Sequence, residues 1–190
     1  MKENNLFGSH IPKLTSGSLL DQLNGCNAPN QEIRALSWKE PFGSLMLPPF
    51  NKIETRTWET KYRGLVLICL SKSAYNMDVV NHNISGREQS ARISNAYGYN
   101  MKFPNLGKAI AIGTLVNCRK MLPTDEDATF VSYKEGWEEE KINKKGKRFV
   151  KKNLYCHVYE NVLPIKPFDW VGRQRWAKVP KDYLSLIQIL

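Results

Sequence analysis

The chain has 190 residues, of which 42% are hydrophobic and 24% charged, so it can bury a core and favours one domain with extensions. Its formal net charge is +10 and its isoelectric point is near 9.5. Such a charge favours a polyanionic partner such as nucleic acid, and a basic protein without one is the alternative. Because no stretch approaches the roughly 20 apolar residues of a membrane span and the N-terminus lacks a secretory signal core, we expect a cytoplasmic protein with no membrane partner.

The cysteines do not indicate a metal site or a disulfide framework. Cys26, Cys69, Cys118 and Cys156 lie far apart, without the close pairs that bind zinc. His157, alone between apolar neighbours, is interpreted as a structural histidine. We therefore predict no metal and no cofactor.

The first part of the chain predicts an extension followed by a strand and a helix. Residues 1–33 are rich in Asn, Gly and Ser and are interpreted as an N-terminal extension. Residues 35–38 suit a strand. A helix is predicted after it, with Pro41 in the first turn, where a missing N–H costs nothing, and with Pro48 ending it.

Residues 51–64 form a dense polar run, with acid, base, aromatic and hydroxyl groups and only Ile53 as an aliphatic residue. If the first half is a strand, Lys52, Glu54, Arg56 and Trp58 share one face. Such a face is either a solvated sheet surface or the wall of a polar pocket. The apolar run at 65–70 then predicts a buried strand.

The second half of the chain predicts mainly strands. A helix is expected over 85–99 with Ser85 as its cap, and a strand over 108–118 with Gly113 at a bulge or a point of close approach. Residues 137–155 predict a hairpin turning at Gly146, followed by a strand over 155–159 and an end segment that mixes Pro, Trp and Gly. The predicted fold is α+β, mainly β, with a small closed or half-closed barrel and a few peripheral helices.

Five segments, in order, resemble the ASCH domain, a branch of the PUA-like superfamily. They are Leu36-Ser37 with Pro41 to Leu45, Ile53 to Trp58 with Tyr62-Arg63-Gly64, Leu67 to Lys72, Gly113 with Leu115 to Cys118, and Tyr155 to Trp176 at several positions. The resemblance covers roughly residues 34–180, which would form the domain between the extension at 1–33 and a tail at 181–190 packing on it. It implies a PUA-like small β-barrel.

The same resemblance implies an RNA-binding module that holds a single nucleotide in a cleft. Some members of the family remove the acetyl group from 4-acetylcytidine, and ribonuclease activity has been proposed for others. In the deacetylating relatives a lysine and a threonine precede the arginine that matches Arg56, and those places hold Asn51 and Glu54 here. Lys52 and Thr55 restore the spacing only if the register slips by one residue, which turns each side chain to the other face.

We therefore favour binding of RNA or a modified nucleotide, with an amidohydrolase on an acylated nucleoside or a ribonuclease as the alternative. If the protein is an enzyme, the candidate catalytic residues are Lys52, Glu54 and Thr55. The predicted cleft consists of Ser37, Trp38, Asn51, Lys52, Glu54, Arg56, Trp58, Ser71 and Lys72. Trp58 is expected to stack on a base, and Glu54 to accept hydrogen bonds from it.

Basic side chains outside the cleft are predicted to contact the nucleic-acid backbone, although a solvated hairpin is an equal explanation for the lysine-rich run. The candidates are Arg63, Lys144, Lys145, Lys147, Arg148, Arg173 and Arg175.

Overall fold

The computed structural model describes residues 32–98, 102–133, 139–142, 146, 148–151, 154–173 and 175–190. Its elements, in chain order, are β1 (Arg34–Trp38), η1 (Ser44–Met46), β2 (Ile53–Arg56), β3 (Gly64–Leu70), α2 (Met77–Val79), the π turn η2 (Val80–Ile84), α3 (Gly86–Tyr97), β4 (Lys108–Lys120), η3 (Pro123–Asp125), α4 (Glu126–Thr129), β5 (Glu139–Ile142), β6 (Arg148–Lys151), β7 (Tyr155–Asp169), β8 (Ala177–Lys178) and η4 (Lys181–Leu186).

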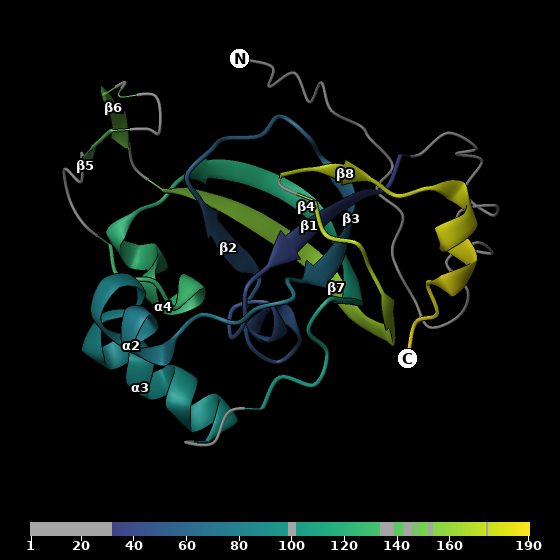
Figure 1. Cartoon of the computed structure of the whole chain (residues 1–190), viewed down its shortest axis with the longest axis horizontal. Helices are drawn as coiled ribbons and strands as arrows, with labels where there is room; N and C mark the ends of the chain where they lie inside the picture. The colour runs from purple at the N-terminus through teal and green to yellow at the C-terminus, as the bar shows by residue number, and fades with distance from the viewer. Residues whose placement is uncertain are drawn as a thin grey trace, which may run out of the picture.

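The main sheet has six strands in the order β2-β7-β4-β3-β1-β8. The β1–β3 pair is parallel and the others are antiparallel, so the sheet is mixed. The strand content and the few helices confirm the α+β, mainly β prediction. Figure 1 shows α2, α3 and α4 gathered beside one end of the sheet, and η4 on the opposite side of the molecule.

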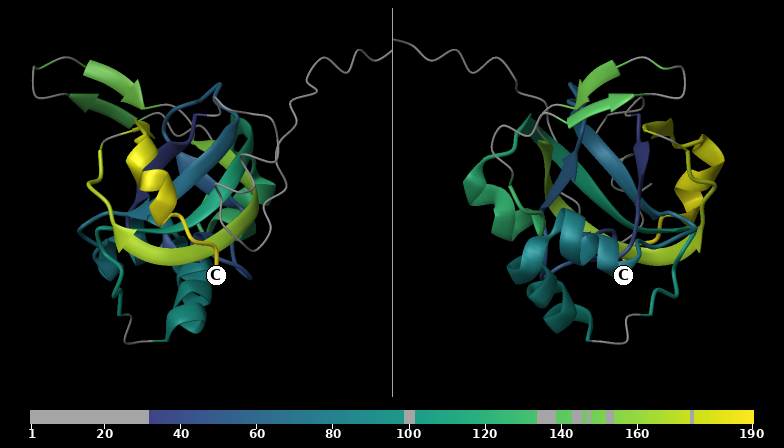
Figure 2. Two further views of the ribbon diagram at one scale, coloured as in Figure 1. Left: turned by 90° about the vertical axis from the view of Figure 1, so that its right-hand side faces the viewer. Right: turned by 60° about the vertical axis from the view of Figure 1, so that its left-hand side comes forward.

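Of the closed or half-closed barrel that was predicted, closure is not observed, because the ladder of the described strands ends at β2 and β8, which do not pair with each other. The long strands β4 and β7 nevertheless arch strongly, as the two views of Figure 2 show. Their pairing shifts register between Ala109 and Ala111, between Ile112 and Thr114, and between Leu115 and Asn117. Each shift bends the strands locally, so the sheet curves without closing.

The buried strand predicted at 65–70 is confirmed, and it is buried on both faces. Leu65, Leu67 and Cys69 pack into one core cluster with Trp170 and Ile187, whereas Val66, Ile68 and Leu70 pack into a second cluster on the other face. The first cluster lies under the C-terminal segment, and the second lies in the hollow of the sheet with Trp38 and Tyr159. Burial of each such side chain contributes about 1.5–3 kcal/mol.

Several local predictions are confirmed by the backbone. Gly113 lies at a register shift, and a Cβ there would meet the Val162 side chain at 2.9 Å, so only glycine allows the close approach of β4 and β7. Strands β5 and β6 pair as an antiparallel hairpin, and Gly146 in its turn has φ +74°.

Other local predictions are corrected. The helix expected after Pro41 is a single 3₁₀ turn, because Leu47, the residue before Pro48, is already extended with ψ at 144°. Ser85 does precede α3, but its hydroxyl makes no capping bond. Strand β7 continues to Asp169, well past the predicted end, and it passes through Pro164 at a register shift, where a missing N–H does not break the ladder.

Candidate functional site

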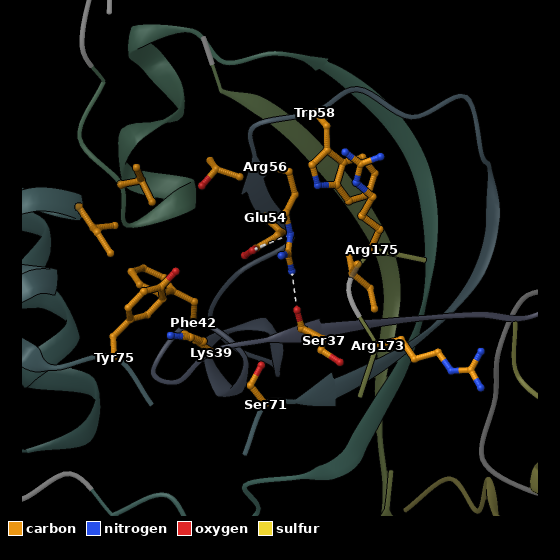
Figure 3. A pocket seen from close by; sticks show the side chains of 14 residues that line it. Ser37, Lys39, Phe42, Glu54, Arg56, Trp58, Ser71, Tyr75, Arg173 and Arg175 are labelled. Carbon is orange, nitrogen blue, oxygen red and sulfur yellow. Dashed lines mark hydrogen bonds and ion pairs between the residues drawn. The ribbon is translucent and has the colours of Figure 1, made fainter. Parts of the chain in front are cut away.

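A polar pocket of about 440 Å³ lies where β1, β2, the segment after β3 and the segment before β8 meet (Figure 3). Ser37, Glu54, Arg56 and Trp58 come from the sheet side, and Ile84 and Val131 come from the helical side of the molecule. The full lining is Leu36, Ser37, Lys39, Phe42, Glu54, Thr55, Arg56, Trp58, Ser71, Tyr75, Ile84, Val131, Arg173 and Arg175.

Glu54 and Arg56 lie two residues apart on β2 and face the pocket, as strand alternation predicts. Arg56 Nε is 3.2 Å from Glu54 Oε1, and Arg56 Nη2 donates a hydrogen bond to the carbonyl of Ser37 at 3.0 Å. The Ser37 contact ties β2 to β1 across the pocket, because these two strands are not neighbours in the sheet. The dashed lines of Figure 3 mark both contacts.

The Glu54 carboxyl is perturbed by its surroundings. Its side chain is only 14% exposed, and burial raises its pKa to about 7, although the Arg56 cation and the Trp38 indole act in the opposite direction. Trp38 Nε1 approaches the carboxyl without reaching the geometry of a hydrogen bond. Near neutral pH this carboxyl is therefore present in both protonation states and can donate or accept a hydrogen bond.

Aromatic packing holds the wall that Trp58 forms. The Trp58 ring meets His157 edge-on at a centroid distance of 4.8 Å and Trp176 at 5.6 Å. His157 Nε2 lies 3.1 Å from the Trp58 carbonyl, which requires a proton on Nε2, and burial lowers the pKa of His157 to about 4. The interpretation of His157 as a structural residue therefore agrees with its contacts.

The remaining predicted cleft residues occupy other positions. Trp38 is 1% exposed and lies beneath the Arg56 guanidinium at 5.2 Å, so it positions Arg56 instead of offering a stacking face. Asn51 is buried, and its N–H donates to the Leu45 carbonyl at 2.7 Å. Lys72 is exposed next to Gly107.

Lys52, the residue on which the deacetylase alternative depended, does not line the pocket. It precedes β2 and lines a separate cavity of about 560 Å³ with Phe50, Glu160 and Asn161. Strand alternation does not extend to it, because β2 begins at Ile53. Thr55, in contrast, does line the pocket together with Glu54.

Among the predicted backbone contacts whose side chains the structure describes, only Arg173 and Arg175 line the pocket. Gly172 lets their segment pass close to β1, since a Cβ there would lie 3.1 Å from Ser37 Oγ. Arg63 instead donates to the carbonyls of Thr60 and Tyr62, at 3.0 and 2.8 Å. Lys144, Lys145 and Lys147 lie outside the described residues, and for Arg148 only the backbone position in β6 is described.

Sequence reasoning missed several lining residues, notably Lys39 and Tyr75. Ser37 and Trp38 were predicted to line the cleft, and Lys39 follows them directly in the sequence. This neighbourhood could have indicated that Lys39 also lines the pocket. For Tyr75 the sequence gives no such indication. Its segment reaches the pocket through a long-range contact, in which the Tyr75 N–H donates a hydrogen bond to the Glu40 carbonyl at 2.8 Å. The Lys39 ammonium lies 4.9 Å from the Tyr75 ring centre.

The charges of the described lining residues are mainly positive, with Lys39, Arg56, Arg173 and Arg175 against Glu54. The described part of the chain brings no three His, Cys, Asp or Glu side chains together as a metal site. Within the same residues, no helix is long and apolar enough to cross a membrane. A scan against protein-family models and a search of the curated proteins find no match to this chain.

Proposed function

We propose that the protein is an ASCH-type, PUA-like protein that binds a nucleotide of RNA, or a modified nucleotide, in the pocket at Glu54 and Arg56. The observation that carries the proposal is the convergence of distant segments that resemble the family. One pocket is lined by residues from these segments, namely Leu36, Ser37, Glu54, Thr55, Arg56, Trp58, Ser71, Arg173 and Arg175. The mixed six-stranded sheet with few helices is compatible with a PUA-like fold.

The pocket has the size and chemistry that a nucleotide requires. Its volume of about 440 Å³ lies within the range of small-molecule sites. Arg173, Arg175 and Lys39 supply cations for a phosphate, and Trp58 supplies a flat apolar wall for a base. Glu54 accepts from a base amino group when ionised, and donates to a ring nitrogen or carbonyl when protonated.

A hydrolase acting at the same pocket is the second candidate. The observation in its favour is the Glu54 carboxyl, with a pKa of about 7, in a pocket that Thr55 also lines. A carboxyl with this pKa can serve as a general base or acid near neutral pH. The position of Lys52 in a different cavity leaves this candidate without the lysine that the deacetylating relatives use.

The binding proposal is tested by titrating the protein with the four ribonucleoside 5′-monophosphates, and with a fluorescein-labelled single-stranded 12-nucleotide RNA, at one fixed salt concentration. We expect Glu54→Gln and Trp58→Ala to weaken binding of both probes by about 5-fold or more at pH 7. Lys52→Ala is the matched control and is expected to bind normally, because Lys52 lies outside the pocket.

Two outcomes contradict a purely binding role for this pocket. One is unchanged binding in the Glu54 and Trp58 variants while Lys145→Ala and Lys147→Ala abolish RNA binding, which would indicate a non-specific polyanion binder. The other is release of acetate from 4-acetylcytidine, or cleavage of the labelled RNA, that depends on Glu54. Either reaction would favour the hydrolase, and activity that persists in Glu54→Gln would place the chemistry elsewhere.

A further inference from the structure

A second cavity of about 420 Å³ lies next to the nucleotide pocket, and Arg173 lines both. The second cavity is bounded by Trp170, Val171, Arg173, Ala177, Lys178, Pro180 and Tyr183, from the segment before β8, from β8 itself and from η4. Figure 3 shows the Arg173 side chain pointing away from Glu54 and Arg56. Arg173 therefore stands at the border between the two cavities.

The second cavity combines cations with aromatic and apolar surface. Trp170 and Tyr183 meet edge to face, with ring centres 5.4 Å apart, and Tyr183 is only partly buried. Val171, which also lines the cavity, is 73% exposed. Lys178 is also 73% exposed, and its contact with Glu32 at 3.2 Å is shared, since Glu32 also pairs with Arg34 at 2.9 Å.

We propose that the ligand is a single-stranded polynucleotide and that the second cavity holds the nucleotide next to the one in the Glu54 pocket. This inference rests on the proposed function and deepens it. Arg173 would bind the phosphate that joins the two nucleotides, because it is the residue that both cavities share. Lys178 would bind the following phosphate, and Tyr183 with Val171 would support the second base.

The chemistry of the cavity favours this occupant over a peptide or a second apolar ligand. Among its described lining residues are two cations and no carboxylate, which suits a polyanion. Aromatic and cationic groups that alternate along a groove are the usual means of holding an unpaired strand. A nucleotide enclosed in the Glu54 pocket must also be out of a base-paired stack, and this costs least free energy when the strand that carries it is already single.

The test compares a fluorescein-labelled random-sequence hexaribonucleotide with the four ribonucleoside 5′-monophosphates. We expect wild-type protein to bind the hexanucleotide at least about 10-fold more tightly than the monophosphates, in keeping with 5- to 150-fold for one added stacked base. Val171→Glu is expected to weaken hexanucleotide binding about 10-fold by repelling phosphate, whereas Val171→Lys preserves or strengthens it. Both variants should bind the monophosphates within about 2-fold of wild type.

Leu190→Glu and Leu190→Lys are the matched controls, because Leu190 is equally exposed at 73% and lines neither cavity. They should change binding of both probes by less than about 2-fold. Lys178→Ala gives a second measure, with an expected loss for the hexanucleotide alone. Since Val171, Leu190 and Lys178 are exposed, these variants should fold, which unchanged melting temperatures verify.

The outcomes separate the two proposals. In one outcome, monophosphate binding depends on Glu54 but the hexanucleotide binds no more tightly than the monophosphates. In another, the two Val171 variants change hexanucleotide affinity no differently from the two Leu190 variants. Either outcome means that the second cavity is not a nucleotide subsite, while the proposal for the first pocket stands. If neither probe binds, both proposals fail. Hexanucleotide binding that depends on Val171 but not on Glu54 would overturn the pocket as the anchor and contradict the joined arrangement.

Discussion

Arg56 and Glu54 form an ion pair, with Nε and Oε1 3.2 Å apart, in a pocket that six separate segments of the chain line. The pair does not fully stabilise the negative charge of Glu54, because burial still raises its pKa to about 7. This carboxyl is consequently a titratable group in the middle of the physiological pH range.

The raised pKa of Glu54 predicts a loss of stability with rising pH. The folded protein retains a proton on Glu54 up to about pH 7, whereas the unfolded chain releases it near the ordinary value of 4.5. Between these values the folded state binds more protons, so its stability falls as pH rises. Over this window wild type should lose about 2–3 kcal/mol relative to Glu54→Gln, measured by urea unfolding at pH 4.5, 6 and 7.5. A difference that does not change with pH would mean that Glu54 ionises normally.

The lowered pKa of His157 predicts the opposite pH dependence from Glu54, namely a loss of stability as pH falls. Burial lowers its pKa to about 4 from an ordinary 6.5. Between pH 6.5 and pH 4, His157 therefore binds a proton in the unfolded chain but not in the folded protein. Its contribution to stability is present above pH 6.5 and is lost as pH falls to 4. Relative to His157→Gln, wild type should lose about 2–3 kcal/mol across this window, measured by the same unfolding method. The contribution of Glu54 to the pH dependence of stability is the same in both proteins and therefore cancels in the comparison. Equal pH profiles would show that His157 takes up its proton in the folded protein at the same pH as in the unfolded chain.

Replacement of Arg175 by glycine is expected to relieve backbone strain and, at the same time, to weaken RNA binding. The φ of Arg175 is +61°, in the left-handed region that costs a non-glycine residue about 1 kcal/mol or more. Arg175→Gly should therefore be as stable as wild type, or more stable by up to about 1 kcal/mol, while it weakens RNA binding. The slope of log Kobs against log salt should become shallower by about 0.7, as expected for one lost contact to a single-stranded phosphate.

Arg173→Gly is the matched control for this prediction. Arg173 also lines the pocket but is not among the described residues with positive φ, so glycine there should cost about 0.5–1 kcal/mol. Both variants lose one cation and should show similar salt slopes. Loss of stability in Arg175→Gly, measured by thermal unfolding, would contradict the strain; unchanged binding in both would remove these arginines from the ligand site.

Local pattern was enough to predict the parts of the fold that depend on near neighbours in the chain. The apolar run at 65–70 indicated a strand buried on both faces, and Gly113 indicated a close approach of strands, because β4 and β7 leave no room there for a Cβ. Alternation along β2 correctly placed Glu54 and Arg56 on one face. These features follow from backbone geometry and from the size of single side chains, and both can be recognised in a few consecutive residues.

Long-range packing decided what the pocket contains. Lys52 was expected in it by extending the alternation one residue beyond the strand, but β2 begins only at Ile53 and Lys52 lies in another cavity. Tyr75 reaches the pocket because its N–H donates a hydrogen bond to the Glu40 carbonyl. Arg173 reaches it because the neighbouring Gly172 lets the chain pass close to Ser37. The pKa of Glu54 likewise depends on burial by residues distant in the chain. The spacing of Glu54 and Arg56 placed them on one face of a strand. Only the packing of the curved, open sheet against the helices and the C-terminal segment encloses them, because enclosure depends on contacts that no periodicity encodes.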